Sequence, residues 1–185
     1  MHKLLSEKSV VFFDVGYTID HPASGDWMFT KLFYELAGER LKRCIVEQIG
    51  QARAAGLAYL EKNHLTRDEE EEADCFRHYY RIVSEALQLE LTENEIAALA
   101  RDRTYNMDNY VIFPDAEKVI RTLSKTHRLG IISDTWPSIE NQLRTLGGSF
   151  PDIAFEAGNV LGNVCGAVLL HQANFDFPHY LYLEN

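Results

Sequence analysis

Two short apolar runs each end in residues that can do chemistry. Val10-Val11-Phe12-Phe13 stops at Asp14, and Leu129-Gly130-Ile131-Ile132 stops at Ser133-Asp134-Thr135. A carboxylate can attack phosphorus or carbon as a nucleophile, and a hydroxyl can hold a phosphoryl oxygen by a hydrogen bond. Both runs have the composition of buried parallel strands, apolar on both faces, and ligands bind at the carboxyl edge of such a sheet. We therefore expect Asp14 and Ser133 to meet at that edge.

A long helical stretch separates these two runs. Residues from about Ser24 to Asn109 repeat apolar side chains at helical spacing and contain no convincing strand. Leu41 to Leu60 predicts one helix, Thr92 to Glu95 is a capping box that opens another, and the acidic run Asp68 to Glu72 is typical of a solvated first turn. The apolar stripes that predict core faces are Phe29, Leu32, Phe33 and Leu36, and Phe76, Tyr79, Tyr80, Val83 and Leu87.

An α/β pattern resumes after this stretch. Phe113-Pro114-Asp115-Ala116 begins a helix with proline in its first turn, and this helix leads directly into the second strand. Ala167-Val168-Leu169-Leu170 is a third, weaker strand of the same kind. The sequence thus predicts an α/β fold whose parallel sheet is interrupted by a helical insert.

Composition and charge exclude several classes of function. The chain has 185 residues and a net charge of −10, which argues against nucleic-acid or membrane-surface binding as its main role. No apolar run is long enough to span a membrane. The three cysteines, Cys44, Cys75 and Cys165, are far apart and lack metal-binding spacing, so we expect reduced, mostly buried thiols in a cytoplasmic protein.

The motifs, their order and the insert resemble the haloacid dehalogenase-like (HAD) hydrolase superfamily. Val10 to Thr18 is similar to its first motif, an apolar strand that ends in a nucleophilic aspartate with a threonine four residues later. Leu129 to Thr135 is similar to its second motif, and the insert matches the position of the family's α-helical cap. The resemblance covers roughly residues 8–146. It implies a Rossmann-like parallel-sheet core of residues 1–19 and 113–185, with a helical cap of residues 20–112.

The resemblance also implies roles for single residues. It makes Asp14 the nucleophile of a hydrolase, most simply a phosphatase acting on a small phosphorylated metabolite. The substrate would be bound by Ser133, Asp134 and Thr18. Mg²⁺ would neutralise the repulsion between the carboxylate and the phosphoryl group. Its ligands would be Asp14, the main-chain carbonyl of Gly16 and Asn159.

Three departures from the family pattern weaken the expected activity. Gly16 stands where the phosphatases carry a second aspartate that protonates the leaving group, a step worth ~10²–10⁴-fold. The family places a lysine after the second strand, but Lys125 is the last lysine here, and Arg144, on a solvent face, is the cation that follows Ser133. Asparagines, Asn159 among them, replace the acidic pair of the metal site, and Mg²⁺ prefers carboxylates.

Other interpretations stay open at this point. The chain can be a catalytically impaired homologue that binds a ligand or partner, or a metal-free 2-haloacid dehalogenase, because that branch also lacks the second acid. The plainest alternative is an Asx-turn at Asp14 with a positive φ at Gly16. The aromatic run 175–183 can dock on its own sheet or on a second copy, so a homodimer is also open.

Overall fold

The computed structural model describes residues 10–133, 135–146, 153–158 and 166–172, which form a mixed α/β protein. In chain order the elements are β1 (Val10–Phe13), β2 (Asp20–Pro22), α2 (Lys31–Lys42), α3 (Val46–Asn63), α4 (Glu69–Ala86), α5 (Glu93–Tyr105), the 3-10 turn η1 (Met107–Asn109), β3 (Tyr110–Ile112), α6 (Pro114–Leu123), β4 (Arg128–Ser133), α7 (Ile139–Leu146), β5 (Ile153–Gly158) and β6 (Gly166–Gln172). The two predicted strands that precede Asp14 and Ser133 are confirmed, as is the helix that begins at Pro114.

The main sheet is mixed, with the order β1-β4-β6-β5. β1 and β4 pair in parallel, with Phe13 opposite Ile131, as predicted. The prediction that the third run joins the sheet in parallel is wrong, because β6 pairs antiparallel with both β4 and β5. Only seven residues separate β5 from β6, and a parallel crossover needs a dozen or more. β1 is an edge strand among the described strands, and its Phe12 is 52% exposed rather than buried.

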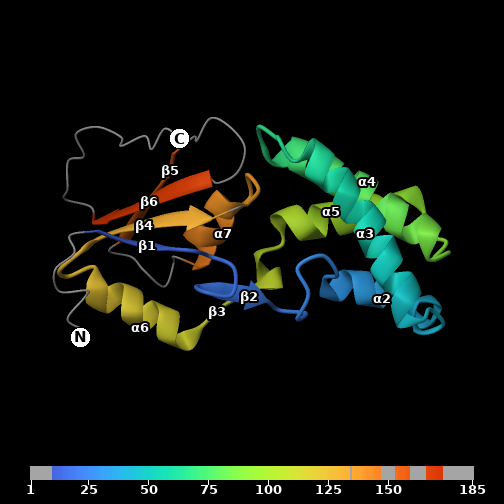
Figure 1. The fold of residues 1–185 in the computed structure, drawn as a ribbon, viewed down its shortest axis with the longest axis horizontal. Helices are drawn as coiled ribbons and strands as arrows, with labels where there is room; N and C mark the ends of the chain where they lie inside the picture. Colours follow the sequence, from blue (N-terminus) through green and yellow to red (C-terminus); the bar gives the residue numbers. More distant parts are fainter. Residues whose placement is uncertain (1–9, 134, 147–152, 159–165, 173–185) are drawn as a thin grey trace.

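Helices α2 to α5, here called the helical unit, lie on one side of the molecule and the main sheet on the other (Figure 1). β1 and β4 run toward the helical unit, so their carboxyl ends face it (Figure 1). α6 and α7 pack on the sheet. Their buried residues Ile120, Leu123 and Leu143 share a cluster with Leu129 and Ile131 of β4.

The helical unit has a hydrophobic core of its own. The predicted stripes supply it, and Phe76, Tyr79 and Tyr80 of α4 are all 0% exposed. The helix predicted over residues 41–60 is confirmed from Val46 onward, as α3, but its predicted start is wrong, because α2 ends at Lys42 and α3 begins at Val46. The chain tightens there into i→i+3 bonds, one of them from the Cys44 amide, which end α2.

α3 approaches α4 closely at Gly56. A Cβ at that position would lie 2.6 Å from the Tyr79 ring, closer than any side chain tolerates, whereas Gly50 of the same helix has nothing within 4 Å. The two glycines of α3 therefore differ: Gly56 has a packing role, and Gly50 has no such close neighbour.

A second, two-stranded sheet connects the two parts. β2 and β3 pair antiparallel, with Asp20 opposite Ile112 and Pro22 opposite Tyr110. They lie between the main sheet and the helical unit (Figure 1). The sequence did not reveal them, because three-residue strands, one containing proline, carry too little alternation to read.

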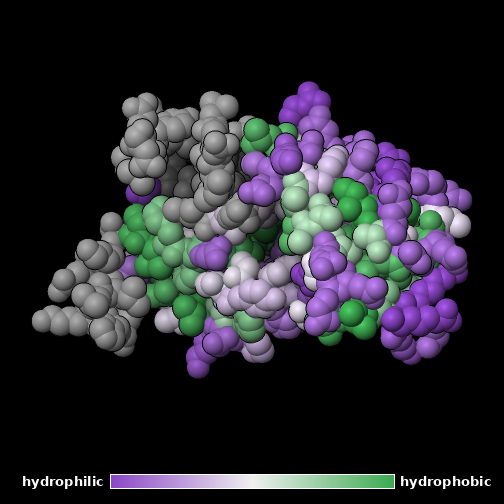
Figure 2. Space-filling view, turned by 45° about the vertical axis from the view of Figure 1, so that its right-hand side comes forward, coloured by the Kyte–Doolittle hydropathy of each residue, from purple (hydrophilic) through white to green (hydrophobic). Residues whose placement is uncertain are grey.

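The described surface is largely hydrophilic over the helical unit. On the face shown in Figure 2, hydrophilic residues predominate there and apolar residues form small groups. Cys44 and Cys75 are free and half-buried. Among the described residues, no helix is long and apolar enough to cross a membrane.

Candidate active site

Asp14 and Ser133 meet at the carboxyl ends of β1 and β4. The Ser133 hydroxyl donates a hydrogen bond of 2.9 Å to Asp14 Oδ1. The parallel register explains this contact, because pairing Phe13 with Ile131 ends both strands at one edge of the sheet. Ser133 is buried, whereas Asp14 is exposed. The structure therefore brings together two residues that are 119 positions apart.

The turn after β1 fixes one oxygen of Asp14 and leaves the other open. The Val15 amide donates to Asp14 Oδ1 at 2.8 Å, so Oδ1 accepts two hydrogen bonds. The Val15 carbonyl accepts from the amides of Thr18, Ile19 and Asp20, which closes the turn. The residue with a positive φ is Tyr17, at 56°, and not Gly16, so the predicted glycine conformation is wrong. Asp14 Oδ2 accepts no hydrogen bond from the described residues.

Aromatic side chains line the turn at Gly16. A Cβ at position 16 would lie 3.4 Å from Trp27 Cζ2, an ordinary van der Waals distance. The Tyr17 ring is 62% exposed and packs edge-on against Trp27, with centroids 5.3 Å apart. The sequence analysis missed Trp27, because nothing in the pattern indicates that residue 27 returns to the turn at 14–20.

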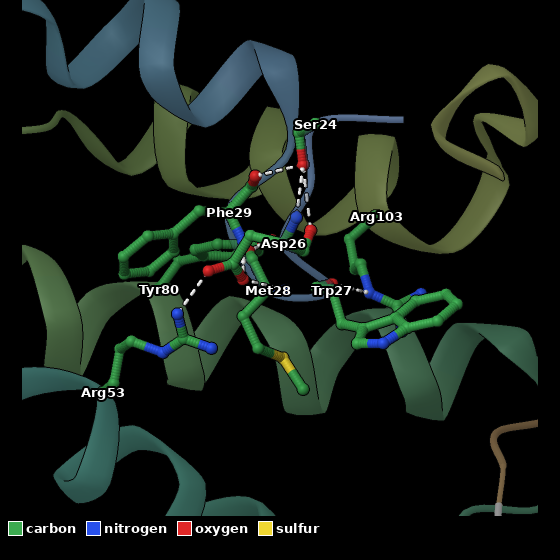
Figure 3. Close-up of polar contacts among 8 residues, drawn as sticks. All are labelled: Ser24, Asp26, Trp27, Met28, Phe29, Arg53, Tyr80 and Arg103. Atoms are coloured by element: carbon green, nitrogen blue, oxygen red, sulfur yellow. Dashed lines mark hydrogen bonds and ion pairs between the residues drawn. The ribbon is translucent and has the colours of Figure 1, made fainter. Parts of the chain in front are cut away.

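The chain around Trp27 is held by polar contacts within the segment Ser24–Phe29 (Figure 3). The Ser24 hydroxyl donates to the Phe29 carbonyl at 2.7 Å. Asp26 Oδ1 accepts from the amides of Met28 and Phe29, and Asp26 Oδ2 pairs with Arg53 of α3. This segment is therefore fixed both internally and to the helical unit.

Two further helices hold the same segment (Figure 3). The Tyr80 hydroxyl of α4 donates to the Met28 carbonyl at 2.7 Å, and Arg103 Nε of α5 donates to the Trp27 carbonyl at 2.9 Å. Arg103 is only 7% exposed and also donates to the Tyr110 hydroxyl. The position of the Trp27 ring beside the candidate site is thus set by α4 and α5.

A second carboxyl group lies buried near Asp14. Asp20 is 0% exposed, and its Oδ2 accepts from the Gln142 side chain of α7, while its Oδ1 has no hydrogen-bond partner among the residues that the structure describes. Burial raises the pKa of Asp20 to about 6; the Gln142 hydrogen bond opposes this shift and the charge of Asp14 adds to it. Burial of a carboxylate is costly, so this site holds its proton to a higher pH than an exposed aspartate does.

A third carboxyl group connects the helical unit to α7. Glu72 of α4 is 0% exposed and accepts two hydrogen bonds from Ser138. The prediction that the acidic run 68–72 is a solvated helix start is correct for its N-cap, Asp68, but wrong for Glu72. Sequence spacing carries no signal for a partner 66 residues away.

The other predicted site residues are not all described. Thr18 lies exposed in the turn, where its amide donates to the Val15 carbonyl. Asp134 and Asn159, and the run 175–183, lie outside the described residues. Arg144 is on the exposed side of α7 and pairs with Glu140, as the predicted solvent face requires.

The donors for a magnesium ion are few among the described residues. No group of three or more His, Cys, Asp or Glu side chains gathers there in a way that could hold a metal. Asp14 Oδ2 and the Gly16 carbonyl are oxygen donors of the right type, and no hydrogen bond of the turn occupies the Gly16 carbonyl. Mg²⁺ often binds through one or two carboxylates together with substrate phosphate and water. The residues therefore fit a weak, substrate-completed site.

Comparisons with protein-family models, with curated proteins and with solved structures found no significant match to this chain. The interpretation of the site accordingly depends on its own residues. These are an exposed carboxylate and a strand-end hydroxyl 2.9 Å apart, at the edge of a sheet that faces the helical unit.

Proposed function

We propose that the protein is a cytoplasmic HAD-like hydrolase that cleaves a small phosphorylated metabolite, with Asp14 as nucleophile. In this proposal the sheet with α6 and α7 is a Rossmann-like core and the helical unit is its cap. The observation that carries the proposal is the 2.9 Å hydrogen bond from Ser133 to Asp14 at the ends of two parallel strands. Ligands bind at this kind of edge in open α/β sheets.

In this proposal the two oxygens of Asp14 have separate tasks. Oδ1 is fixed by the Val15 amide and the Ser133 hydroxyl, which leaves Oδ2 to attack. The new Oδ2–phosphorus bond forms as the bond to the leaving oxygen breaks, and water then hydrolyses the aspartyl phosphate. Ser133 can instead donate to a phosphoryl oxygen once substrate is bound.

The leaving group must depart without an acid at position 16. Gly16 offers no proton, so substrates with weakly basic leaving groups, such as aryl or acyl phosphates, are expected to react faster than alkyl phosphates. The exposed Tyr17 ring and Trp27 give such a group an aromatic surface at the same place. Mg²⁺, held by Asp14 and the Gly16 carbonyl, would lower the repulsion between carboxylate and phosphate.

The test is phosphate release from phenyl phosphate in the presence of Mg²⁺. Wild-type protein should release phosphate, and Asp14→Asn should not. Asp115→Asn, which changes an exposed aspartate in the first turn of α6, should behave as wild type. Equal hydrolysis by wild type and Asp14→Asn would remove Asp14 as the nucleophile.

A second candidate function is binding without turnover. Gly16, which removes the leaving-group acid, is the observation that favours it. In that case phosphate or Mg²⁺ raises the melting temperature while no phosphate is released from phenyl phosphate. Chloride release from a 2-chloro acid without metal would instead identify a dehalogenase.

A further inference from the structure

One buried carboxyl group makes two hydrogen bonds between the helical unit and the core. Glu72 Oε2 accepts the Ser138 amide at 2.8 Å, and Glu72 Oε1 is 2.7 Å from the Ser138 hydroxyl. Ser138 directly precedes α7, so its amide is one of the helix's free donors. A side chain of α4 therefore caps a helix of the core.

Two neighbouring contacts also join α4 to α7 and to the residues just before it. The Phe76 ring of α4 packs against Trp136, with centroids 4.9 Å apart. Asn141 of α7 donates to Glu69, one turn before Glu72, at 2.6 Å. Two turns of α4, from Glu69 to Phe76, therefore contact the first turn of α7 and the residues just before it.

The segment that α4 contacts comes just after Ser133 of the candidate site in the sequence. Ser138 follows Ser133 by five residues, and its carbonyl accepts the Gln142 amide at 3.0 Å. The Gln142 side chain in turn donates to Asp20, the buried carboxyl group near Asp14. The hydrogen bonds therefore run from α4 through α7 to the turn that carries the nucleophile.

We propose that Glu72 is a positioning residue, which holds the helical unit closed over Asp14 and fixes the chain after Ser133 in the same step. This inference rests on the proposed function, because it assigns the closed arrangement to substrate binding. Glu72 itself touches no reacting atom.

Proton uptake accompanies closure. Burial raises the pKa of Glu72 to about 7, against the lowering effect of the Ser138 hydrogen bonds and of Arg103 from α5. The other charged or titratable groups that face it are Glu69, Cys75 and Tyr110. The neutral acid keeps both contacts, since one oxygen still accepts the amide and the protonated oxygen donates to the hydroxyl. Closure is therefore favoured most at low pH, weakens as the pH rises from the ordinary pKa of a glutamate to about 7, and levels off above that.

Three variants separate positioning from folding. Glu72→Ala removes both contacts, and Glu72→Gln keeps them, because its amide oxygen accepts and its nitrogen donates. Glu85→Gln is the matched control, since Glu85 is an exposed glutamate of the same helix.

The first measurement is KM and kcat for phenyl phosphate across a pH series. Glu72→Ala should raise KM roughly tenfold while kcat changes by less than about twofold, as a lost closure contact would. The ratio of wild-type KM to Glu72→Gln KM should rise roughly fivefold between about pH 6 and about pH 8.5. The ionisation of the substrate cancels in this ratio. A ratio that stays flat, or an unchanged KM in a folded Glu72→Ala, would overturn the proposal.

The second measurement needs no turnover. Hydrogen exchange of the Ser138 amide, with the Gln142 amide as internal reference, should lose roughly tenfold protection as the pH rises from about 6 to about 8 in wild type and keep it in Glu72→Gln. Equal protection of Ser138 in wild type and both Glu72 variants at every pH contradicts the inference. If phenyl phosphate is not cleaved, the proposed function fails, whereas the exchange data still decide whether Glu72 holds the closed arrangement.

Discussion

Two carboxyl groups of this protein each accept a hydrogen bond from a serine hydroxyl, but one carboxyl group is exposed to solvent and the other is buried. Asp14 accepts from Ser133 at 2.9 Å in an exposed turn, and Glu72 accepts from Ser138 at 2.7 Å in a site that is 0% exposed. Among the described residues, no donor reaches the second oxygen of the exposed carboxyl, whereas both oxygens of the buried one accept hydrogen bonds. The same kind of contact thus occurs once in an exposed turn and once as a buried link between two parts of the fold.

Breaking the exposed pair should have the largest effect. Asp14→Asn should lower kcat for phenyl phosphate by about 10³-fold or more, because the amide is a poor nucleophile. The free energy of unfolding should change by less than about 0.5 kcal/mol, since Asp14 is exposed. Steady-state kinetics and urea denaturation check the two parts. A large loss of stability would show instead that Asp14 is a structural turn residue.

A second carboxyl group beside Asp14 would test whether the exposed site lacks only a leaving-group acid. Gly16→Asp should raise kcat for an alkyl phosphate by about 10²-fold, and that for phenyl phosphate far less, because only the poor leaving group needs an acid. The position tolerates a side chain, since its Cβ would lie 3.4 Å from Trp27. Gly16→Asn has the same shape without the proton and should leave the alkyl rate unchanged. A gain in that control would point to packing rather than acid catalysis.

Glu72 belongs to the helical unit, and Gly56→Ala tests how closely α3 and α4 pack within that unit. A Cβ there would lie 2.6 Å from the Tyr79 ring, so α3 and α4 must separate, at a cost of about 1–3 kcal/mol in unfolding free energy. Gly50→Ala, on the same helix with nothing within 4 Å, should stabilise by about 0.5–1 kcal/mol. Urea denaturation measures both. Equal effects at the two positions would contradict the close approach at Gly56.

Titration of the buried groups gives an effect that builds up gradually with pH. The pKa is raised to about 7 for Glu72 and to about 6 for Asp20, so the folded protein binds more protons than the unfolded chain between about pH 4 and pH 7. Stability should therefore be greatest below that range and fall as pH rises through it, by about 3 kcal/mol for each group.

Substitution separates the two contributions. Glu72→Gln should remove the part of the fall that lies nearest pH 7, and Asp20→Asn the part nearest pH 6. Urea midpoints across the pH series measure this. Wild-type stability that rises over the same range would contradict the raised pKa values.

The sequence predicted the contact at the sheet edge and missed the one between the two parts. Asp14 and Ser133 both follow apolar strands, so local pattern and the parallel register place them together. Glu72 looked like one more acidic residue of a first turn, since its burial comes from Ser138, far along the chain. The direction of β6 was likewise missed, because a short apolar run carries no information on its partner.

The β2–β3 ladder has a consequence for how such a protein can arise and be rebuilt. Pro22 and Tyr110 are opposite each other, so the chain leaves for the helices and returns at neighbouring positions, with Cα atoms about 5 Å apart. A turn of a few residues can span that gap. Such a turn in place of the four helices would therefore keep the spacing of β2 and β3, while α7 would lose the cap from Glu72.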